Sequence, residues 1–382
     1  MKKSPDYIFA ITVGILLILG IVILASCSTI ASQEKFGNTY HYLSHQLIFG
    51  ILPGLFLAYF FYRIPLSFLK KKSFFLLLAN LILLFLVFVP KIGANFEQGA
   101  NRWINLGPIL FQPSEFLKIS FILYLGYWLK KKGNFPQKRF KFSKNNFLKN
   151  FSLNESNKTL IAFLAILGVA GGLLILQPDI STLGVICSIG LIMYFLAGAP
   201  IWHLFFLISG GLGMLILLIK IAPYRMARFL IFLKPELYPM GIGYHLKQSL
   251  IAVGSGGVKG LGLGLSRQRF GFLPGAMSDS VFAVFSEETG FIGSFILILL
   301  FMILLSQGFK IAKRAKDKSL QLMGFGITSW LVIQAFVNIG AMIRIVPLTG
   351  IPLPFISYGG SAIITELIGV GILLNISKQS KS

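Results

Sequence analysis

Ten separate stretches of this chain are apolar and long enough to cross the hydrocarbon core of a bilayer, which is about 30 Å thick. Only helices and closed barrels cross lipid, because every backbone N–H and C=O there must be hydrogen-bonded within the structure. Stretches of this length predict an all-α polytopic membrane protein of ten transmembrane helices, with residues 1–382 forming a single membrane domain. They lie near residues 7–28, 44–62, 73–90, 113–129, 159–176, 180–197, 200–220, 281–306, 322–342 and 360–377.

The first stretch also has a second interpretation. Lys2 and Lys3, the apolar run and Leu24-Ala25-Ser26-Cys27 together resemble a lipoprotein signal with its lipobox. The run has the length of a span rather than of a short signal core, and nine more spans follow it. We therefore expect an uncleaved transmembrane helix here.

Lysine and arginine are distributed unevenly over the connections between the stretches. With the amino terminus in the cytoplasm, the cytoplasmic segments carry 22 of the 35 Lys and Arg residues. Basic residues are in excess on cytoplasmic loops, so we expect both termini to be cytoplasmic and the protein to reside in the cytoplasmic membrane. The same bias accounts for the net charge of +23 without a nucleic-acid partner. Segment 130–158 is predicted to be a basic cytoplasmic connector facing anionic membrane lipids.

This orientation leaves four polar segments outside. They are 91–118, 177–180, 343–361 and a long extracytoplasmic loop, 221–280, between the seventh and eighth helices. Basic residues outnumber acids on this side as well, which breaks the usual bias and points to an anionic partner.

Asp279 lies where the long outer loop meets the eighth apolar stretch, in a chain with only 12 acidic residues. A carboxylate at a membrane boundary costs free energy unless it is paired or used, which makes it a functional candidate. Glu287 and Glu288 follow about two turns deeper. One of them is expected to orient Asp279 or pair with a base, the alternative being a contact between helices.

The other outer segments add candidates with two interpretations each. Glu115 and Lys118 share a helix face, either as a pair that neutralises itself or, with Arg102, as the lining of a polar cavity. Asp179 follows Gln177 and either caps a helix or binds a ligand. The segment around Ser357 is rich in Pro and Gly, and such a re-entrant loop is allowed at depth only where it packs on protein or lines a cavity.

Together these motifs resemble one family, the SEDS peptidoglycan glycosyltransferases of cell division (FtsW) and elongation (RodA). The resemblance covers roughly residues 95–375. The matching motifs are Gly99–Gly107, Gln112–Glu115 with Lys118, Gln177–Asp179, Gly254–Gly257, Leu273-Pro274 with Asp279, Glu287–Glu288 with Gly290, and Pro352–Ser361. The stretch Gly262–Gln268 favours the division type, and the elongation type is the alternative.

The resemblance implies polymerisation of lipid II on the outer face of the membrane, with a class B penicillin-binding transpeptidase and division proteins as partners. It implies Asp279 as the catalytic carboxylate, a general base for the acceptor 4-hydroxyl, with inversion at the anomeric carbon. Basic side chains would stabilise the leaving diphosphate. The resemblance does not imply a particular cofactor, and it leaves open whether the site binds a divalent cation. A lipid II flippase or a scaffold for the transpeptidase are the rival functions. The expected substrate-binding residues are Arg102, Glu115, Lys118, Gln177, Asp179, Arg225, Lys247, Glu288 and Ser357.

The chain departs from the family pattern close to Asp279. The family usually has Glu, His, Thr and Phe where this chain has Gly275, Met277, Ser278 and Ser280. Gly275 removes a second carboxylate near the expected site. Arg344 is a further charge that the pattern does not predict.

Overall fold

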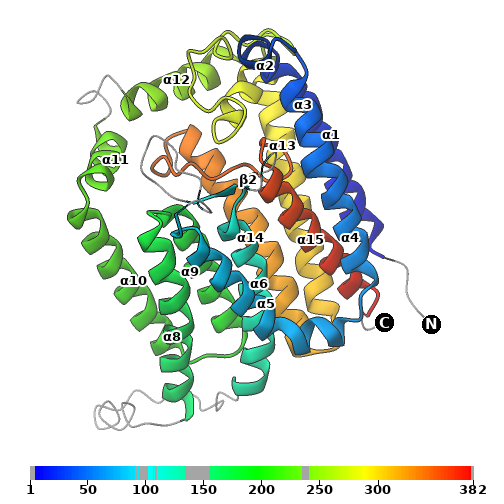
Figure 1. Cartoon of the computed structure of the whole chain (residues 1–382), viewed down its shortest axis with the longest axis vertical. Helices are drawn as coiled ribbons and strands as arrows, with labels where there is room; N and C mark the ends of the chain where they lie inside the picture. Colours follow the sequence, from blue (N-terminus) through cyan, green and yellow to red (C-terminus); the bar gives the residue numbers. More distant parts are fainter. Residues whose placement is uncertain are drawn as a thin grey trace.

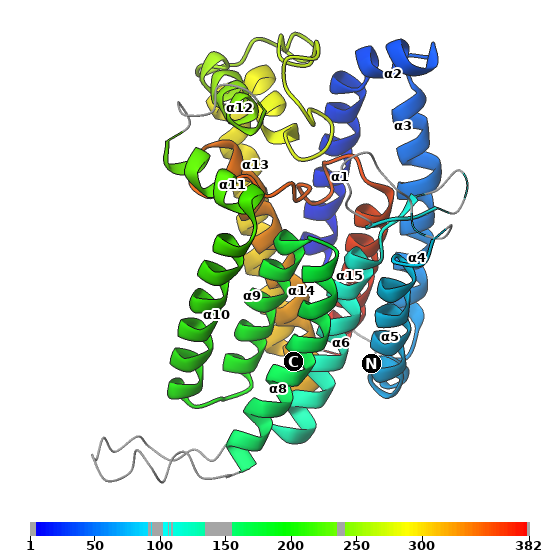
Figure 2. The ribbon, with the colours of Figure 1, turned by 60° about the vertical axis from the view of Figure 1, so that its left-hand side comes forward.

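The computed structural model describes residues 5–90, 93, 102–105, 107, 110–133, 155–234 and 241–379. The predicted connector 130–158 therefore lies largely outside the described residues. The rest is a bundle of long helices (Figures 1 and 2). The first half of the chain forms α1 (Tyr7–Cys27), α2 (Thr29–Phe36), α3 (His41–Gln46), the π-helix η1 (Leu47–Ile51), α4 (Leu52–Arg63), α5 (Leu66–Leu86), α6 (Pro113–Lys132) and α8 (Glu155–Leu176). The second half comprises α9 (Ile180–Leu196), α10 (Ile201–Ile221), α11 (Pro223–Leu233), α12 (Ile242–Ser255), α13 (Val281–Arg314), α14 (Lys318–Met342) and α15 (Gly360–Ser377).

Each of the ten predicted stretches coincides with a helix, the second being built from α3, η1 and α4 in continuous succession. Within the described residues, seven of these are long and apolar enough to cross a membrane by length and composition. The other three are α5 and α6, which carry several charges, and α9, which has 17 residues. Helix α5 begins at Leu66 rather than near 73, since its lysines can extend along the helix toward water.

Two features depart from the predicted pattern. A short antiparallel pair of strands, β1 (Ile104–Asn105) and β2 (Leu110–Phe111), precedes α6. The segment 221–280, predicted as a loop, contains helices α11 and α12 before it continues in turns to Ser280. Both helices lie at the same end of the bundle as α2 (Figure 2).

Helix α13 is interrupted at Gly290, whose backbone combines a positive φ with an extended ψ (φ 67°, ψ −163°). The backbone of the preceding loop completes the hydrogen bonds that the break opens. The N–H groups of Leu261 and Gly262 donate to the carbonyls of Glu287 and Glu288, both at 3.0 Å, and Phe291 N–H donates to the carbonyl of Gly257. A loop can therefore cross a helix here without leaving backbone groups unpaired.

Helices α14 and α15 lie at the centre of the bundle and α10 at its edge. Buried residues make up 83% of the most apolar part of α15 and 72% of that of α14, against 11% for α10. Helix α15 packs against α4, and α14 packs against α13, α6 and α9. The central helices also bring polar side chains inside, among them Gln334 and Asn338 of α14 and Glu366 of α15.

Candidate functional site

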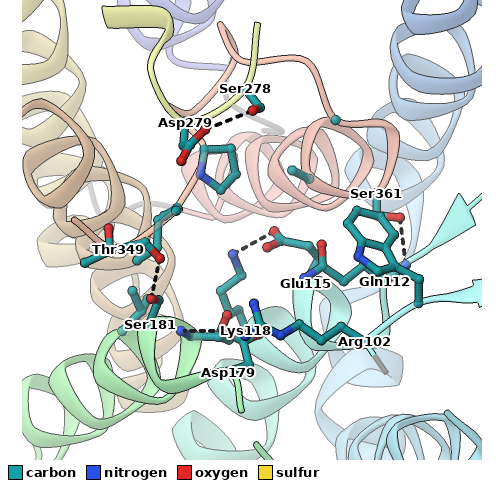
Figure 3. A pocket seen from close by; sticks show the side chains of 18 of the residues that line it. Arg102, Gln112, Glu115, Lys118, Asp179, Ser181, Ser278, Asp279, Thr349 and Ser361 are labelled. Carbon is teal, nitrogen blue, oxygen red and sulfur yellow. Dashed lines mark hydrogen bonds and ion pairs between the residues drawn. The ribbon is translucent and has the colours of Figure 1, made fainter. Parts of the chain in front are cut away.

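A cavity of about 500 Å³ opens among the first turns of α6, α9 and α15, the turn before α13 and the segment before α15 (Figure 3). Its lining is mixed polar and apolar, and it contains three carboxylates together with an arginine and a lysine. The lining residues are Arg102, Trp103, Gln112, Glu115, Lys118, Asp179, Ser181, Thr182, Val185, Ser278, Asp279, Thr349, Gly350, Ile351, Pro352, Tyr358, Gly359, Ser361 and Ala362.

Asp279 lies in the last turn before α13, and its backbone is held from two sides. Asn338 Nδ2 on α14 donates to its carbonyl at 2.8 Å. On the other side the segment before α15 binds the preceding residues, since Ser357 Oγ donates to the Ser278 carbonyl and Tyr358 N–H donates to the Met277 carbonyl. Ser278 Oγ donates to Asp279 Oδ1 at 3.0 Å. The carboxylate is thus fixed at the cavity wall by contacts with elements far away in the sequence.

Gly275 allows this position of the carboxylate. Its backbone is left-handed (φ +65°), and a Cβ placed there would lie 2.1 Å from Asp279 Oδ1. Any side chain at this position would displace the carboxylate, in addition to the strain of a left-handed non-glycine residue. The glycine therefore does more than remove a second carboxylate, because it also leaves space for Asp279.

Lys118 and Glu115 form a buried ion pair at the inner end of the cavity. Lys118 Nζ lies 2.6 Å from Glu115 Oε2, and both side chains are almost fully buried. Lys118 also donates to Gln334 Oε1 at 2.8 Å, and Gln334 Nε2 donates to Glu366 Oε1 at 3.2 Å. Two carboxylates, one ammonium and an amide thus form a connected network across α6, α14 and α15. Such a network fixes a unique arrangement of these helices.

Arg102 and Asp179 occupy the opposite wall from Asp279 in Figure 3. Arg102 Nε donates to the Gln177 carbonyl at 3.1 Å and Nη2 to the Pro178 carbonyl at 2.5 Å. Asp179 Oδ1 accepts from Thr182 N–H and caps α9. Its Oδ2 is buried without a hydrogen-bond partner in the described part of the chain. The Arg102 guanidinium and an Asp179 carboxylate that keeps one oxygen without a hydrogen-bond partner in the described residues therefore line the same cavity.

Two basic groups of the outer segment complete the surroundings of Asp279. Arg228 is on α11; the burial of its guanidinium and the nearby charge of Arg102 lower its pKa, whereas Asp279 raises it. His245 is on α12; burial lowers its pKa, against the opposing effect of Asp279, and Arg228 lowers it further. His245 Nε2 lies 2.5 Å from Ser280 Oγ.

Comparisons with known proteins agree with this arrangement. The family described as "Cell cycle protein", which groups FtsW, RodA and SpoVE, matches residues 6–382. The chain belongs to this family, the SEDS proteins. It is a multi-pass membrane protein.

Two curated relatives illustrate the similarity. Stage V sporulation protein E of Bacillus subtilis is 37% identical over 380 residues, covering 100% of this chain and 99% of that protein. The probable peptidoglycan glycosyltransferase FtsW of Coxiella burnetii is 39% identical over 371 residues, covering 96% of this chain and 94% of that protein.

Two solved structures share the SEDS fold. One chain, from the structure described as "Structural coordination of polymerization and crosslinking by a peptidoglycan synthase complex", is 27% identical with a TM-score of 0.75, covering 99% of this chain and 98% of that one. The rod shape determining protein RodA of Thermus thermophilus is 26% identical with a TM-score of 0.68, covering 99% and 98%.

The residues predicted from the sequence fall into three groups in this SEDS chain. Five line the cavity: Arg102, Glu115, Lys118, Asp179 and Asp279. Both interpretations of the Glu115–Lys118 pair hold at once, and Asp179 is both a cap and part of the lining. The expectation that the segment around Ser357 lines a cavity is confirmed, because six of its neighbours between Thr349 and Gly359 do so.

Gln177 and Ser357 do not line the cavity, but they bind the lining residues Arg102 and Ser278. The Gln177 carbonyl accepts from Arg102, while its amide donates to the Leu84 carbonyl at 2.8 Å. Ser357 Oγ accepts from Leu353 N–H and donates to the Ser278 carbonyl.

Arg225, Lys247 and Glu288 lie outside the cavity lining. Arg225 donates to the Tyr224 hydroxyl and the Leu218 carbonyl, and Lys247 is exposed on α12. Glu288 accepts from Ser26 Oγ of α1 at 2.5 Å. Its neighbour Glu287 accepts from Ser266 Oγ and from the backbone of Arg267. Glu288 thus joins α13 to α1, a contact between helices, which was the alternative to orienting Asp279, and Glu287 binds the segment at Ser266 and Arg267.

Several polar residues that build the site were not predicted from the sequence. Glu366, Gln334 and Asn338 are fully buried in the central helices. The rule that selected Glu115, an acid inside an apolar span, also applies to Glu366. Arg344, unexplained by the motif pattern, donates to the carbonyls of Phe232 and Leu233 at 3.0 Å each and so anchors the end of α11. Among the described residues, no group of three or more His, Cys, Asp or Glu side chains could hold a metal ion.

Proposed function

We propose that this chain is a peptidoglycan glycosyltransferase that polymerises lipid II on the outer face of the cytoplasmic membrane, with Asp279 as its catalytic carboxylate. One observation carries the proposal: a single cavity holds Asp279 together with Arg102 and Lys118. Membership of the SEDS family and relatives named as probable peptidoglycan glycosyltransferases support it.

In the proposed reaction Asp279 takes the proton from the 4-hydroxyl of the acceptor sugar. That oxygen attacks the anomeric carbon of the donor as the bond from this carbon to the diphosphate oxygen breaks. Attack opposite the leaving group inverts the anomeric centre. Such a general base accelerates a reaction by about 10²–10⁴-fold.

The leaving diphosphate needs a cation, and Arg102 is suited to this role. It donates to two backbone carbonyls and makes no ion pair with a carboxylate in the described part of the chain. Its positive charge is therefore not neutralised in advance, whereas Lys118 is already paired with Glu115. Arg228, which lies near both Arg102 and Asp279, adds to the positive potential. Preorganised charges of this kind stabilise a developing anion strongly in a site with little water.

Both termini are proposed to be cytoplasmic. The N–H of Asp6 donates to Ser377 Oγ at 3.2 Å, so the two described ends of the chain lie together. Asp317, in the connection between α13 and α14, forms ion pairs with Lys70 of α5 and with Lys130 of α6. Burial raises the pKa of Asp317, but hydrogen bonds from these two lysines outweigh it and lower the pKa overall. This basic end of the bundle fits the cytoplasmic side.

A class B penicillin-binding transpeptidase and division proteins are the proposed partners. The similar chain in the structure described as a peptidoglycan synthase complex supports an association of this kind. We propose the division type, since FtsW names recur among the similar proteins, with sporulation protein E and RodA as relatives of the same fold.

The test is polymerisation of labelled lipid II by purified protein, alone and with its transpeptidase partner, read as glycan length on a gel. Asp279→Asn, which keeps the shape of the side chain, should reduce polymer formation at least about 100-fold. Glu34→Gln is the matched control, because Glu34 is an exposed carboxylate on α2, and it should retain wild-type activity.

The outcomes separate the rival functions. Unimpaired polymer from Asp279→Asn would exclude the general-base role. No polymer from wild-type protein with any partner would favour a flippase or a scaffold instead, and a lipid-translocation assay would then distinguish these two.

A further inference from the structure

His245 contacts the turn that carries Asp279, from a helix that the motif pattern leaves without a role. It lies on α12 (Ile242–Ser255), in the outer segment. Its Nε2 is 2.5 Å from Ser280 Oγ, and Ser280 directly follows Asp279 in the chain. Ser280 is fully buried. The contact is therefore an internal connection between α12 and the turn.

The proton positions follow from the partners of Ser280. Ser280 Oγ also lies 2.8 Å from the Pro274 carbonyl, which can only accept. The single hydroxyl proton therefore goes to Pro274, and Ser280 Oγ accepts from His245 Nε2–H. This tautomer leaves Nδ1 as the nitrogen that gains a proton on acidification. The hydrogen bonds from His245 to Ser280 and from Ser280 to Pro274 therefore close the turn. In addition, Ser280 N–H donates to the Gly275 carbonyl at 3.0 Å and joins the two ends of the turn.

Three supports thus hold the turn of Asp279. Asn338 binds it from α14, and Ser357 and Tyr358 bind it from the segment before α15. His245 is the third, and of these it alone changes charge between pH 5 and 8 without a large shift. Asp279 also raises the pKa of His245, so the carboxylate lies close enough to the imidazole for their charges to interact.

We propose that His245 is a positioning residue for Asp279: through Ser280 it fixes the turn that carries the carboxylate, and in its neutral form it leaves that carboxylate basic. The proposal rests on the proposed function, because it assigns His245 to the same reaction. A protonated imidazole would stabilise the Asp279 carboxylate and weaken it as a base, since linked groups shift each other's proton affinity reciprocally.

The surroundings of His245 favour the neutral imidazole, chiefly because the side chain is buried. Burial and Arg228 lower its pKa, and Asp279 opposes them. The other titratable groups on the elements packed against α12 are engaged elsewhere or lie on its own surface. Glu287 binds the loop at Ser266, Glu288 binds Ser26, Arg344 binds the end of α11, and Tyr244 and Lys247 belong to α12 itself.

The experiment measures the rate of lipid II polymerisation by the full-length protein with its transpeptidase partner, between about pH 5 and 8. His245→Ala should lower the rate at pH 7.5 by roughly tenfold to 100-fold, because misplacing a catalytic group by about 1 Å has an effect of this size. His245→Gln keeps an N–H donor for Ser280 and should recover activity to within about threefold of wild type. Because glutamine does not titrate, the His245→Gln variant should keep its polymerisation rate to a lower pH than the wild type does. Gln248→Ala, on the same helix, is the control.

A second comparison tests the path through Ser280. Ser280→Ala and the double variant His245→Ala/Ser280→Ala should be about equally impaired, because both single changes break the same connection. Additive losses would contradict it. A wild-type rate and pH profile for His245→Ala, with Asp279→Asn inactive, would overturn the role of His245 and leave the proposed function intact. Inactivity of the wild-type protein would instead overturn the proposed function.

Discussion

Helices α15 and α10 are both apolar spans, yet they have opposite surroundings. Buried residues make up 83% of the most apolar part of α15, and these include Glu366 and Thr365. In α10 the corresponding share is 11%, and Phe205 and Leu212 are exposed by 76% and 56%. Lipid is as apolar as leucine, so an exposed apolar side chain in a span contributes little to the fold. The inner helix instead uses polar contacts to fix its position.

This difference explains why hydropathy alone ranks the helices in a misleading order. Helix α6 carries Glu115 and Lys118 and lies beside the cavity, but it is not among the helices that satisfy the length and composition criteria for a span. Helix α10 satisfies them easily and contributes nothing to the cavity lining. Helix α6 is thus less apolar than the exposed helix α10, although only α6 contributes to the cavity lining. Three substitutions test the contrast, from the largest expected effect to the smallest.

Lys118→Met should have the largest effect. It leaves Glu115 buried without its cation, and breaking a buried pair from one side costs about 3–5 kcal/mol. We expect a large fall in thermal stability in detergent and loss of polymerisation. Lys71→Met, at an exposed lysine of α5, should change neither.

The double variant Glu115→Gln/Lys118→Met sharpens this prediction. It removes both charges of the pair and should be more stable than Lys118→Met alone, because Glu115 no longer stays buried as a carboxylate without its cation. If the double variant is the less stable of the two, the pair is not what stabilises this region.

Gly275→Ala should strongly reduce polymerisation and largely preserve the fold. The new Cβ would displace the Asp279 carboxylate, and a displacement of about 1 Å lowers a rate on the order of 100-fold. The left-handed backbone adds roughly 1–2 kcal/mol of strain. Polymerisation and thermal unfolding measured together separate the two effects. Gly254→Ala is the control, since a Cβ there meets nothing within 4 Å, and full activity of Gly275→Ala would refute the close contact.

Phe205→Ala should have the smallest effect. The side chain points away from the bundle on α10, and exposed substitutions usually change the free energy of unfolding by less than about 0.5 kcal/mol. Polymerisation and thermal stability in detergent should match the wild type. A loss comparable with that of Lys118→Met would mean that α10 is not a lipid-facing helix.

The sequence predicted the helices well because each span must satisfy its backbone internally, which ties hydropathy directly to helix formation. Exact ends were harder. Helix α5 begins at Leu66, but its lysines interrupt the apolar pattern, so its beginning was not predicted. The apolar pattern also did not predict helices α11 and α12 within 221–280. A segment near the membrane surface does not need to be apolar to be helical.

Predicted site residues line the cavity where a charge lies inside a span or beside its end, as for Asp279 and Lys118. It worked less well in the outer segment, where Arg225 and Lys247 face away from the cavity while Arg228 and His245 lie near Asp279. Neighbouring residues of a helix point in different directions, and the sequence does not show which face of α11 or α12 packs inward. Gly275 could be identified as a departure, but only the backbone geometry explains it.

The break in α13 at Gly290 has a consequence for how this protein is made. The partners that complete the broken helix come from residues 257–262, which leave the ribosome before α13 does. The short segment that begins at Val281, next to Asp279, can therefore reach its final pairing without α14 or α15. Two supports of the Asp279 turn are made later, namely Asn338 of α14 and the segment before α15 with Ser357 and Tyr358. During synthesis, the break in α13 should thus be completed first, and the Asp279 carboxylate should be fixed only after α14 and the segment before α15 are in place.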